Sequence, residues 1–233
     1  MTALVLKLIA AFSMLCDHAC IMVFPQLSFL RIIGRLAFPI YAFFIAEGFL
    51  HTRNRLKYFL RIFVFGILCQ IVFFIVERRM YLGVLITFSI SIILMWLYER
   101  ARNSIASSLS GEKRSPAVRD GAFFVLGAAL SFLLCRFVEV DYGFIGIMIP
   151  VCTSISKDRK IRLLGFGTCL CALCIYECVA HKSFIQLASL AALPLLALYN
   201  GETGTRPGSR FKYFFYIFYA AHFIVLYLLS LII

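Results

Sequence analysis

Hydrophobic residues fall into long runs along this chain, and short polar segments separate the runs. A helix needs about 20 apolar residues to cross the hydrocarbon core of a bilayer. We therefore predict membrane-spanning helices over residues 4–24, 29–50, 56–76, 81–98, 120–139, 142–156, 161–180, 183–199 and 211–233. The count is about nine, between eight and ten, because the sixth run is short and fits a re-entrant segment as well as a span.

The composition agrees with this pattern. Hydrophobic residues make up 63% of the 233 positions, whereas soluble domains are about half apolar. The loops are short, so we expect a single integral-membrane domain over residues 1–233, built as an all-α polytopic helical bundle. The first run has no basic flank before it and no small-residue cleavage site after it, so we do not interpret it as a signal peptide.

Basic residues alternate between the two sets of loops. The loops around 51–57, 100–119, 157–162 and 206–212 contain fifteen lysines and arginines, whereas the other set contains four. Cytoplasmic loops carry the excess of basic residues in membrane proteins, so we predict a cytoplasmic N-terminus and nine spans. The pair Arg78–Arg79 is the exception, because it falls on the outer side.

The formal charge of +12 does not indicate a nucleic-acid partner, because the charges lie in short loops between apolar runs. They fit the anionic headgroups of a lipid bilayer better. Most of the nine cysteines lie inside apolar runs, where cysteine serves as a small hydrophobic residue. We expect neither a disulfide framework nor a metal site.

The first span carries ionisable residues that lipid-buried helices rarely contain. Asp17 and His18 are neighbours, and Lys7 lies eleven residues before the histidine. Eleven helical steps return to nearly the same face, about 16 Å along the axis. Intramembrane charges are costly and suggest a functional site. The alternatives are a snorkelling role for Lys7 and a helix-packing hydrogen bond for His18.

The second span supplies a partner for Asp17. Adjacent side chains on a helix point apart, so we expect Asp17 to pair with a cation of another span and not with His18. Arg35 falls at a similar depth, and an Asp17–Arg35 pair would satisfy both charges, in a structural or a functional role. Pro39 should kink this span and free backbone groups.

A group of cations follows the inner end of the second span. This density has two interpretations, a topology signal or a site for a phosphate-rich ligand, because guanidinium groups bind phosphate bidentately. The candidate donor-binding residues are Lys7, Glu47, Arg53, Arg55, Lys57 and Arg61.

Polar residues at the outer side form a second group. Arg136, Glu139 and Asp141 are either a solvated rim or an acceptor entrance. In the last span His222 lies among tyrosines, and structural and functional roles for it both stay open. The candidate acceptor-binding residues are Asp141, Tyr142, Glu177 and His222.

Five stretches of the chain resemble the TraX family of membrane proteins, which is named for acetylation of the conjugal pilin N-terminus. They are KLIAAFSMLCDH at 7–18, GRLAFPIYAFFIAEGFLHTRN at 34–54, DYGFIGI at 141–147, LYNGE at 198–202 and KYFFYIFYAAH at 212–222. TraX-like proteins are distantly similar to membrane acyltransferase family three, in which a basic residue precedes the first-helix histidine by eleven positions. Lys7 and His18 have that spacing.

The resemblance implies acetyl-CoA entering from the cytoplasm and an acceptor on the far side. His18 would be the general base, Asp17 would hold Arg35, and Arg35 or a helix-break amide near Pro39 would stabilise the oxyanion. The acceptor would be a peptide, a pilin or a cell-surface glycan, and the location the bacterial cytoplasmic membrane. The alternatives are a small proton-coupled transporter and a non-catalytic assembly factor of a secretion or conjugation system.

Overall fold

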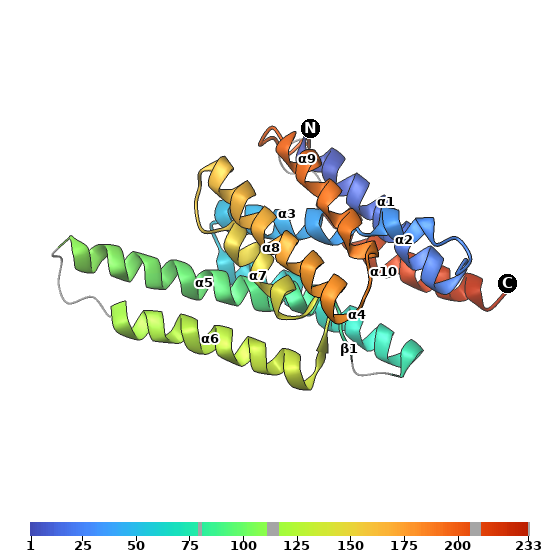
Figure 1. Cartoon of the computed structure of the whole chain (residues 1–233), viewed down its shortest axis with the longest axis horizontal. Coiled ribbons are helices and arrows are strands. Elements are labelled where there is room, and N and C mark those ends of the chain that lie inside the picture. Colours follow the sequence, from blue (N-terminus) through green and yellow to red (C-terminus); the bar gives the residue numbers. More distant parts are fainter. Residues whose placement is uncertain (79–80, 111–116, 206–210, 233) are drawn as a thin grey trace. The chain divides into compact units, whose positions relative to one another are not determined.

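The computed structural model describes residues 1–78, 81–110, 117–205 and 211–232. Most of these residues lie in helices (Figure 1). The elements are α1 (Ala3–Met22), α2 (Phe29–Gly34), α3 (Ala37–His51), α4 (Arg55–Glu77), β1 (Tyr81–Leu82), α5 (Val84–Leu109), α6 (Ala117–Phe137), β2 (Glu139–Val140), α7 (Gly143–Thr153), α8 (Arg159–Ala180), the 3-10 helix η1 (Ile185–Ala191), α9 (Ala192–Ala197) and α10 (Phe211–Ser230).

Each of the nine predicted spans has a helical counterpart. Within the described ranges, six segments are long and apolar enough to cross a bilayer, as expected of a multi-pass membrane protein: Ala3–Met22, Phe29–His51, Arg55–Ile75, Val84–Leu109, Ala117–Phe137 and Arg159–Ala180. The counterparts of the sixth, eighth and ninth predictions are shorter apolar helices. The number of crossings and the cytoplasmic N-terminus stay predictions, and Arg79, Lys113, Arg114, Arg206 and Arg210 of the charge argument lie outside the described residues.

The second predicted span is interrupted between α2 and α3. Leu36 N–H donates to the Ile33 carbonyl, three residues back, and α3 then begins at Ala37. Pro39 explains the position of this break, because a proline cannot donate to the carbonyl four residues earlier and its ring clashes with that carbonyl, here Arg35. The predicted effect of Pro39 therefore appears one turn before the proline.

The chain divides into two compact units, residues 1–44 with 163–233 and residues 45–162. In the first unit α1 packs against α2 and α10, and α2 packs against η1. The first turn of α1 is closed by the segment after α9, because Ala3 and Leu4 donate to the carbonyls of Glu202 and Thr203 at 2.8 and 3.1 Å. These bonds satisfy helix-terminal N–H groups that have no partner within a helix.

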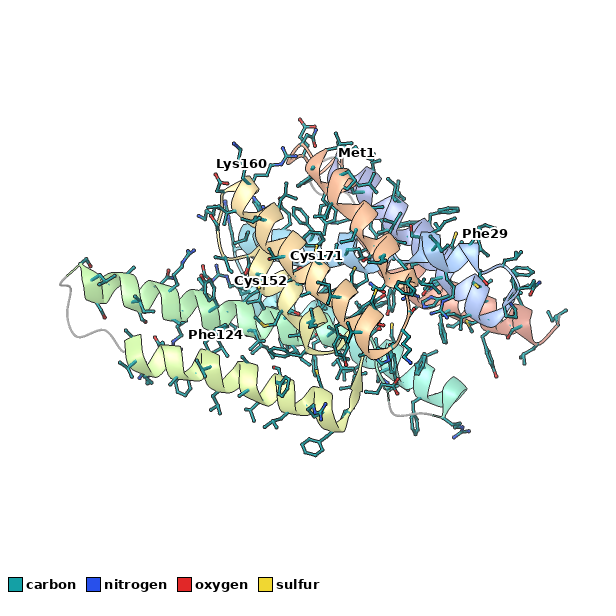
Figure 2. All side chains as sticks on the ribbon, viewed as in Figure 1. Met1, Phe29, Phe124, Cys152, Lys160 and Cys171 are labelled. Carbon is teal, nitrogen blue, oxygen red and sulfur yellow. The ribbon has the colours of Figure 1, made fainter. Side chains whose placement is uncertain are left out.

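In the second unit α5 is central and packs against α4, α6 and α7. Figure 1 shows α5 and α6 running side by side, and Figure 2 labels Phe124 of α6, whose ring lies 5.6 Å from that of Tyr98 on α5. Many large apolar side chains of α4 and α6 are exposed, among them Leu68, Ile75 and Leu130. Such surfaces suit contact with lipid.

The loop predicted around residues 100–119 is largely helical where it is described, since α5 continues to Leu109 and α6 starts at Ala117. A buried carboxylate connects the two extensions. Asp120 is only 2% exposed and accepts from Arg100 Nε at 3.2 Å and Ser104 Oγ at 2.5 Å. These bonds stabilise the continuation of α5 as a helix, because residues 100 and 104 lie on the same helical face.

Candidate functional site

An ion pair joins α1 to the end of α2. Arg35 Nη2 lies 2.7 Å from Asp17 Oδ1 and 3.0 Å from Oδ2, and both side chains are largely buried. Arg31 contributes a weaker contact, with its Nε 3.8 Å from the same carboxylate. The predicted Asp17–Arg35 pair is therefore confirmed. Two charges that would each be costly alone are neutralised together.

Gly34 allows α2 to approach this carboxylate. A Cβ atom built on Gly34 would lie 2.4 Å from Asp17 Cβ and 2.7 Å from Oδ1, closer than non-bonded atoms approach. The glycine is therefore required by the close packing of α2 on α1 and not by an unusual backbone conformation. It brings Arg35, the next residue, within reach of Asp17.

Replacing Gly34 by alanine should separate α2 from α1 and lower the free energy of unfolding by about 1–3 kcal/mol, the usual cost of overpacking. Thermal unfolding in detergent measures the effect. The matched control is Gly121→Ala in α6, where an added Cβ meets nothing within 4 Å. That change should be neutral or stabilising by up to about 1 kcal/mol, since alanine favours helix. Equal effects of the two changes would contradict the packing argument.

Gln186 of η1 extends the ion pair. Its Oε1 accepts from Arg35 Nη1 at 3.4 Å, and the residue is 4% exposed. Because a guanidinium only donates, the amide oxygen must face Arg35 and the amide nitrogen must face away. In the described part of the chain Nε2 is buried without a hydrogen-bond partner. Gln186 was not predicted from the sequence, because a single neutral amide inside an apolar run is a weak signal.

His18 of α1 is hydrogen-bonded to His222 of α10. The distance from His18 Nδ1 to His222 Nε2 is 2.7 Å, and the two ring planes are 17° apart. His222 Nδ1 lies 2.8 Å from the Phe218 carbonyl oxygen, one helical turn earlier. His222 is 5% exposed, and His18 is half-buried. His222, predicted to bind the acceptor, thus contacts the predicted base itself.

Lys7 lies on α1 as predicted, and its side chain is half-buried. The ammonium nitrogen sits 4.9 Å from the centre of the Phe44 ring, in a cation–π contact. Such a contact stabilises the ammonium group over the ring face. Lys7 and His18 therefore mark two positions along one helix of the first unit.

The comparisons with known proteins fit this architecture. The model of the family described as "TraX protein" matches residues 3–230. This chain belongs to the TraX family. A "Probable fimbrial assembly protein FimC, serogroup H1" of Dichelobacter nodosus is 28% identical over 97% of this chain and 94% of its own length. An uncharacterized protein of Rickettsia prowazekii (strain Madrid E) is 27% identical over 78% of this chain and 65% of its own length. No solved structure matches.

The family match includes the predicted donor-binding residues, which lie in the second unit apart from Lys7. Arg53, Lys57 and Arg61 have exposed side chains. Arg55 pairs with Glu99 and stacks on the Phe49 ring at 4.6 Å. The Glu47 carboxylate accepts from Arg162 Nη2 at 2.5 Å. Glu47 and Arg55 therefore each have an internal ionic partner, and their predicted role in the TraX-family site stays a prediction.

The remaining predicted acceptor residues of this TraX-family chain belong to both units. Asp141 contributes backbone groups, since its N–H donates to the Leu82 carbonyl and its own carbonyl accepts from Thr87 Oγ1. Tyr142 precedes α7 with a left-handed backbone, at φ 60°. Both lie in the second unit, whereas Glu177 is half-buried on the part of α8 in the first unit. Of these four predicted residues, His222 forms a hydrogen bond with His18.

Proposed function

We propose that this protein is a membrane acetyltransferase that moves an acetyl group from acetyl-CoA to an amine or hydroxyl of an acceptor. The observation that carries the proposal is the His18–His222 hydrogen bond beside the Asp17–Arg35 ion pair, eleven residues along α1 from Lys7. Intramembrane groups of this kind are expensive and mark sites of function. An imidazole that stays neutral near pH 7 is a suitable general base.

The reaction needs few components, because a thioester is already activated. His18 takes a proton from the attacking amine or hydroxyl, and the acceptor atom bonds to the thioester carbonyl carbon. The tetrahedral intermediate then collapses, the carbon–sulfur bond breaks, and His18 returns the proton to the leaving CoA sulfur. The products are the acetylated acceptor and free CoA, with His18 neutral again.

In this proposal Arg35 and the Gln186 amide donate hydrogen bonds to the tetrahedral intermediate. Arg35 is held in place by Asp17 and contacts the Gln186 amide oxygen, which directs the amide N–H groups of Gln186 away from the cation. A buried donor of this kind is suited to an oxyanion, because it needs no reorganisation when the charge develops. The helix break at Arg35, caused by Pro39, is next to these donors.

Basic side chains would bind the acetyl-CoA donor. Lys7 of the first unit lies over Phe44, and Arg53, Lys57 and Arg61 of the second unit are exposed just before and within the first two turns of α4. With the N-terminus in the cytoplasm, all four would lie toward the compartment that contains acetyl-CoA. Their charges match the phosphates of CoA, and guanidinium groups bind phosphate in two-pronged fashion.

The family suggests where the activity is used. The resemblance to the TraX family implies acetylation of a conjugal pilin, and the Dichelobacter nodosus relative is named for fimbrial assembly. We therefore place the protein in the cytoplasmic membrane with a role in pilus or conjugation systems. The acceptor class is a pilin or other peptide amine, with a cell-surface glycan hydroxyl as the second class.

Radiolabelled acetyl-CoA tests the proposal in membranes with and without the protein, with a cell-envelope fraction as acceptor. Membranes that contain the protein should transfer label, and mass spectrometry should find a product heavier by one acetyl group. Lys7→Ala should raise the KM for acetyl-CoA more than it changes kcat. No label transfer by correctly folded protein would contradict enzymatic function.

The relative's name favours a second candidate function, a non-catalytic assembly factor. Such a protein would assist pilus formation without turning over acetyl-CoA. Pilus assembly that is lost on deletion but restored by His18→Ala would support this candidate against the enzyme. Solute flux in proteoliposomes without CoA turnover would instead favour a transporter.

A further inference from the structure

The hydrogen-bond chain that ends at the Phe218 carbonyl decides which nitrogen of each histidine carries a proton. A carbonyl oxygen only accepts, so His222 Nδ1, 2.8 Å away, must be the donor N–H. A neutral imidazole has one N–H and one bare nitrogen. His222 Nε2 is therefore bare and accepts.

The same reasoning extends to His18. The 2.7 Å separation between His18 Nδ1 and His222 Nε2 requires one proton between the two nitrogens. Since His222 Nε2 is bare, that proton belongs to His18 Nδ1. The Nε2 atom of His18 is then the nitrogen with a free lone pair.

We propose that His222 is a positioning residue that holds His18 in the Nδ1–H form, so that His18 Nε2 is the general base. The catalytic part rests on the proposed function, whereas the tautomer assignment does not. When Nε2 takes a proton, the positive charge of the His18 ring is shared through its N–H···N bond with His222. At the other end of this hydrogen-bond chain, the Phe218 carbonyl accepts from His222 Nδ1–H.

Aromatic packing fixes the orientation of both rings. The Phe218 ring lies 5.2 Å from the His222 ring with the planes 11° apart, and Tyr219 meets His222 edge-on at 6.0 Å. Phe223 meets the His18 ring edge-on at 5.9 Å. A ring flip of His222 would break both of its hydrogen bonds and disturb these contacts. The bare nitrogen of His222 is thus kept toward His18.

Nuclear magnetic resonance of histidine nitrogens tests the assignment directly. The chain has four histidines, and His51 and His181 are exposed, so a His51→Gln/His181→Gln protein leaves only the pair. In lipid bilayers with ¹⁵N-histidine, both rings should be Nδ1–H with a coupling between His18 Nδ1 and His222 Nε2. In His222→Leu, His18 should shift toward the Nε2–H form. An Nε2–H form of His18 in the parent protein would overturn the inference.

Kinetics supply the second readout. His222→Leu should lower kcat for acetyl transfer by about 10²-fold with the KM for acetyl-CoA little changed, because only the proton-transfer step is affected. His222→Gln should recover most of the loss, since its amide oxygen offers an acceptor to His18 Nδ1–H. If His222→Leu fails to fold, the glutamine variant still decides: loss of the Nδ1–H form of His18 in a folded His222→Gln protein overturns the inference.

The positioning role of His222 and the acetyltransferase activity can be contradicted independently of each other. The expected tautomers without acetyl transfer would support the positioning role and contradict the enzyme. Acetyl transfer that depends on His18 in the Nε2–H form would support the enzyme and contradict the positioning role.

Discussion

Replacing His18 by alanine is expected to lower acetyl transfer by on the order of 10²–10⁴-fold, the usual contribution of a general base. The variant loses the nitrogen that takes the acceptor's proton, and the remaining hydrogen bond of His222 to Phe218 is unaffected. Acetyl-CoA binding should be retained, because Lys7 is eleven residues away on α1. The measurement is label transfer from acetyl-CoA at saturating donor, with binding followed separately.

The matched control for this prediction is His181→Ala. His181 is exposed and follows α8, and its ring contacts Tyr176 and not the histidine pair. That variant should transfer label as the parent protein does. Undiminished transfer by folded His18→Ala protein would exclude His18 as the base and leave the Asp17–Arg35 pair without a catalytic neighbour.

Replacing Asp17 by alanine should lower the free energy of unfolding by about 3–5 kcal/mol, because it removes the carboxylate that pairs with the largely buried Arg35. Arg35 is 14% exposed in its side chain, and Asp17 Oδ1 is its partner at 2.7 Å. Gln186 offers only a neutral oxygen at 3.4 Å, which does not replace the carboxylate charge. Equilibrium unfolding in mixed detergent micelles measures the loss, and lowered abundance in membranes should accompany it.

The double variant Asp17→Ala/Arg35→Ala distinguishes charge from packing. Removing both side chains also removes the buried cation that has lost its carboxylate, so the double variant should be more stable than Asp17→Ala alone. Arg31→Ala is the matched control, since the Arg31 side chain is 42% exposed and 3.8 Å from the carboxylate. It should cost no more than about 1 kcal/mol. A double variant less stable than Asp17→Ala would show that the side chains act through packing.

The ion pair and the histidine pair were predictable to different degrees. Asp17 and Arg35 lie in consecutive spans at similar depths, and two opposite charges in lipid have few other ways to lower their energy. His222 was recognised as unusual, but its hydrogen bond to His18 was not predicted, because 204 residues separate the two histidines. Gln186 was missed entirely, since a single neutral amide in an apolar run carries little signal of its own.

The interruption of the second span shows the same division between local and distant effects. Pro39 predicted a disturbance of the helix, and the missing N–H with the ring clash locates it at Arg35. What the break achieves depends on neighbours from elsewhere in the chain: α1 supplies Asp17 and η1 supplies Gln186. Pro39 accounts for the interruption of the helix, whereas the tertiary fold supplies the side chains that bind Arg35.

The sequence alone determined where the helices are, because in a bilayer each apolar run must satisfy its backbone hydrogen bonds within itself. It also marked Lys7, Asp17, His18, Arg35 and His222, because ionisable groups in such runs are costly. Only the tertiary structure decided that α10 lies against α1 and that His222 bonds to His18. Membrane helices are apolar on all sides, so no hydrophobic stripe in the sequence indicates which helices are neighbours.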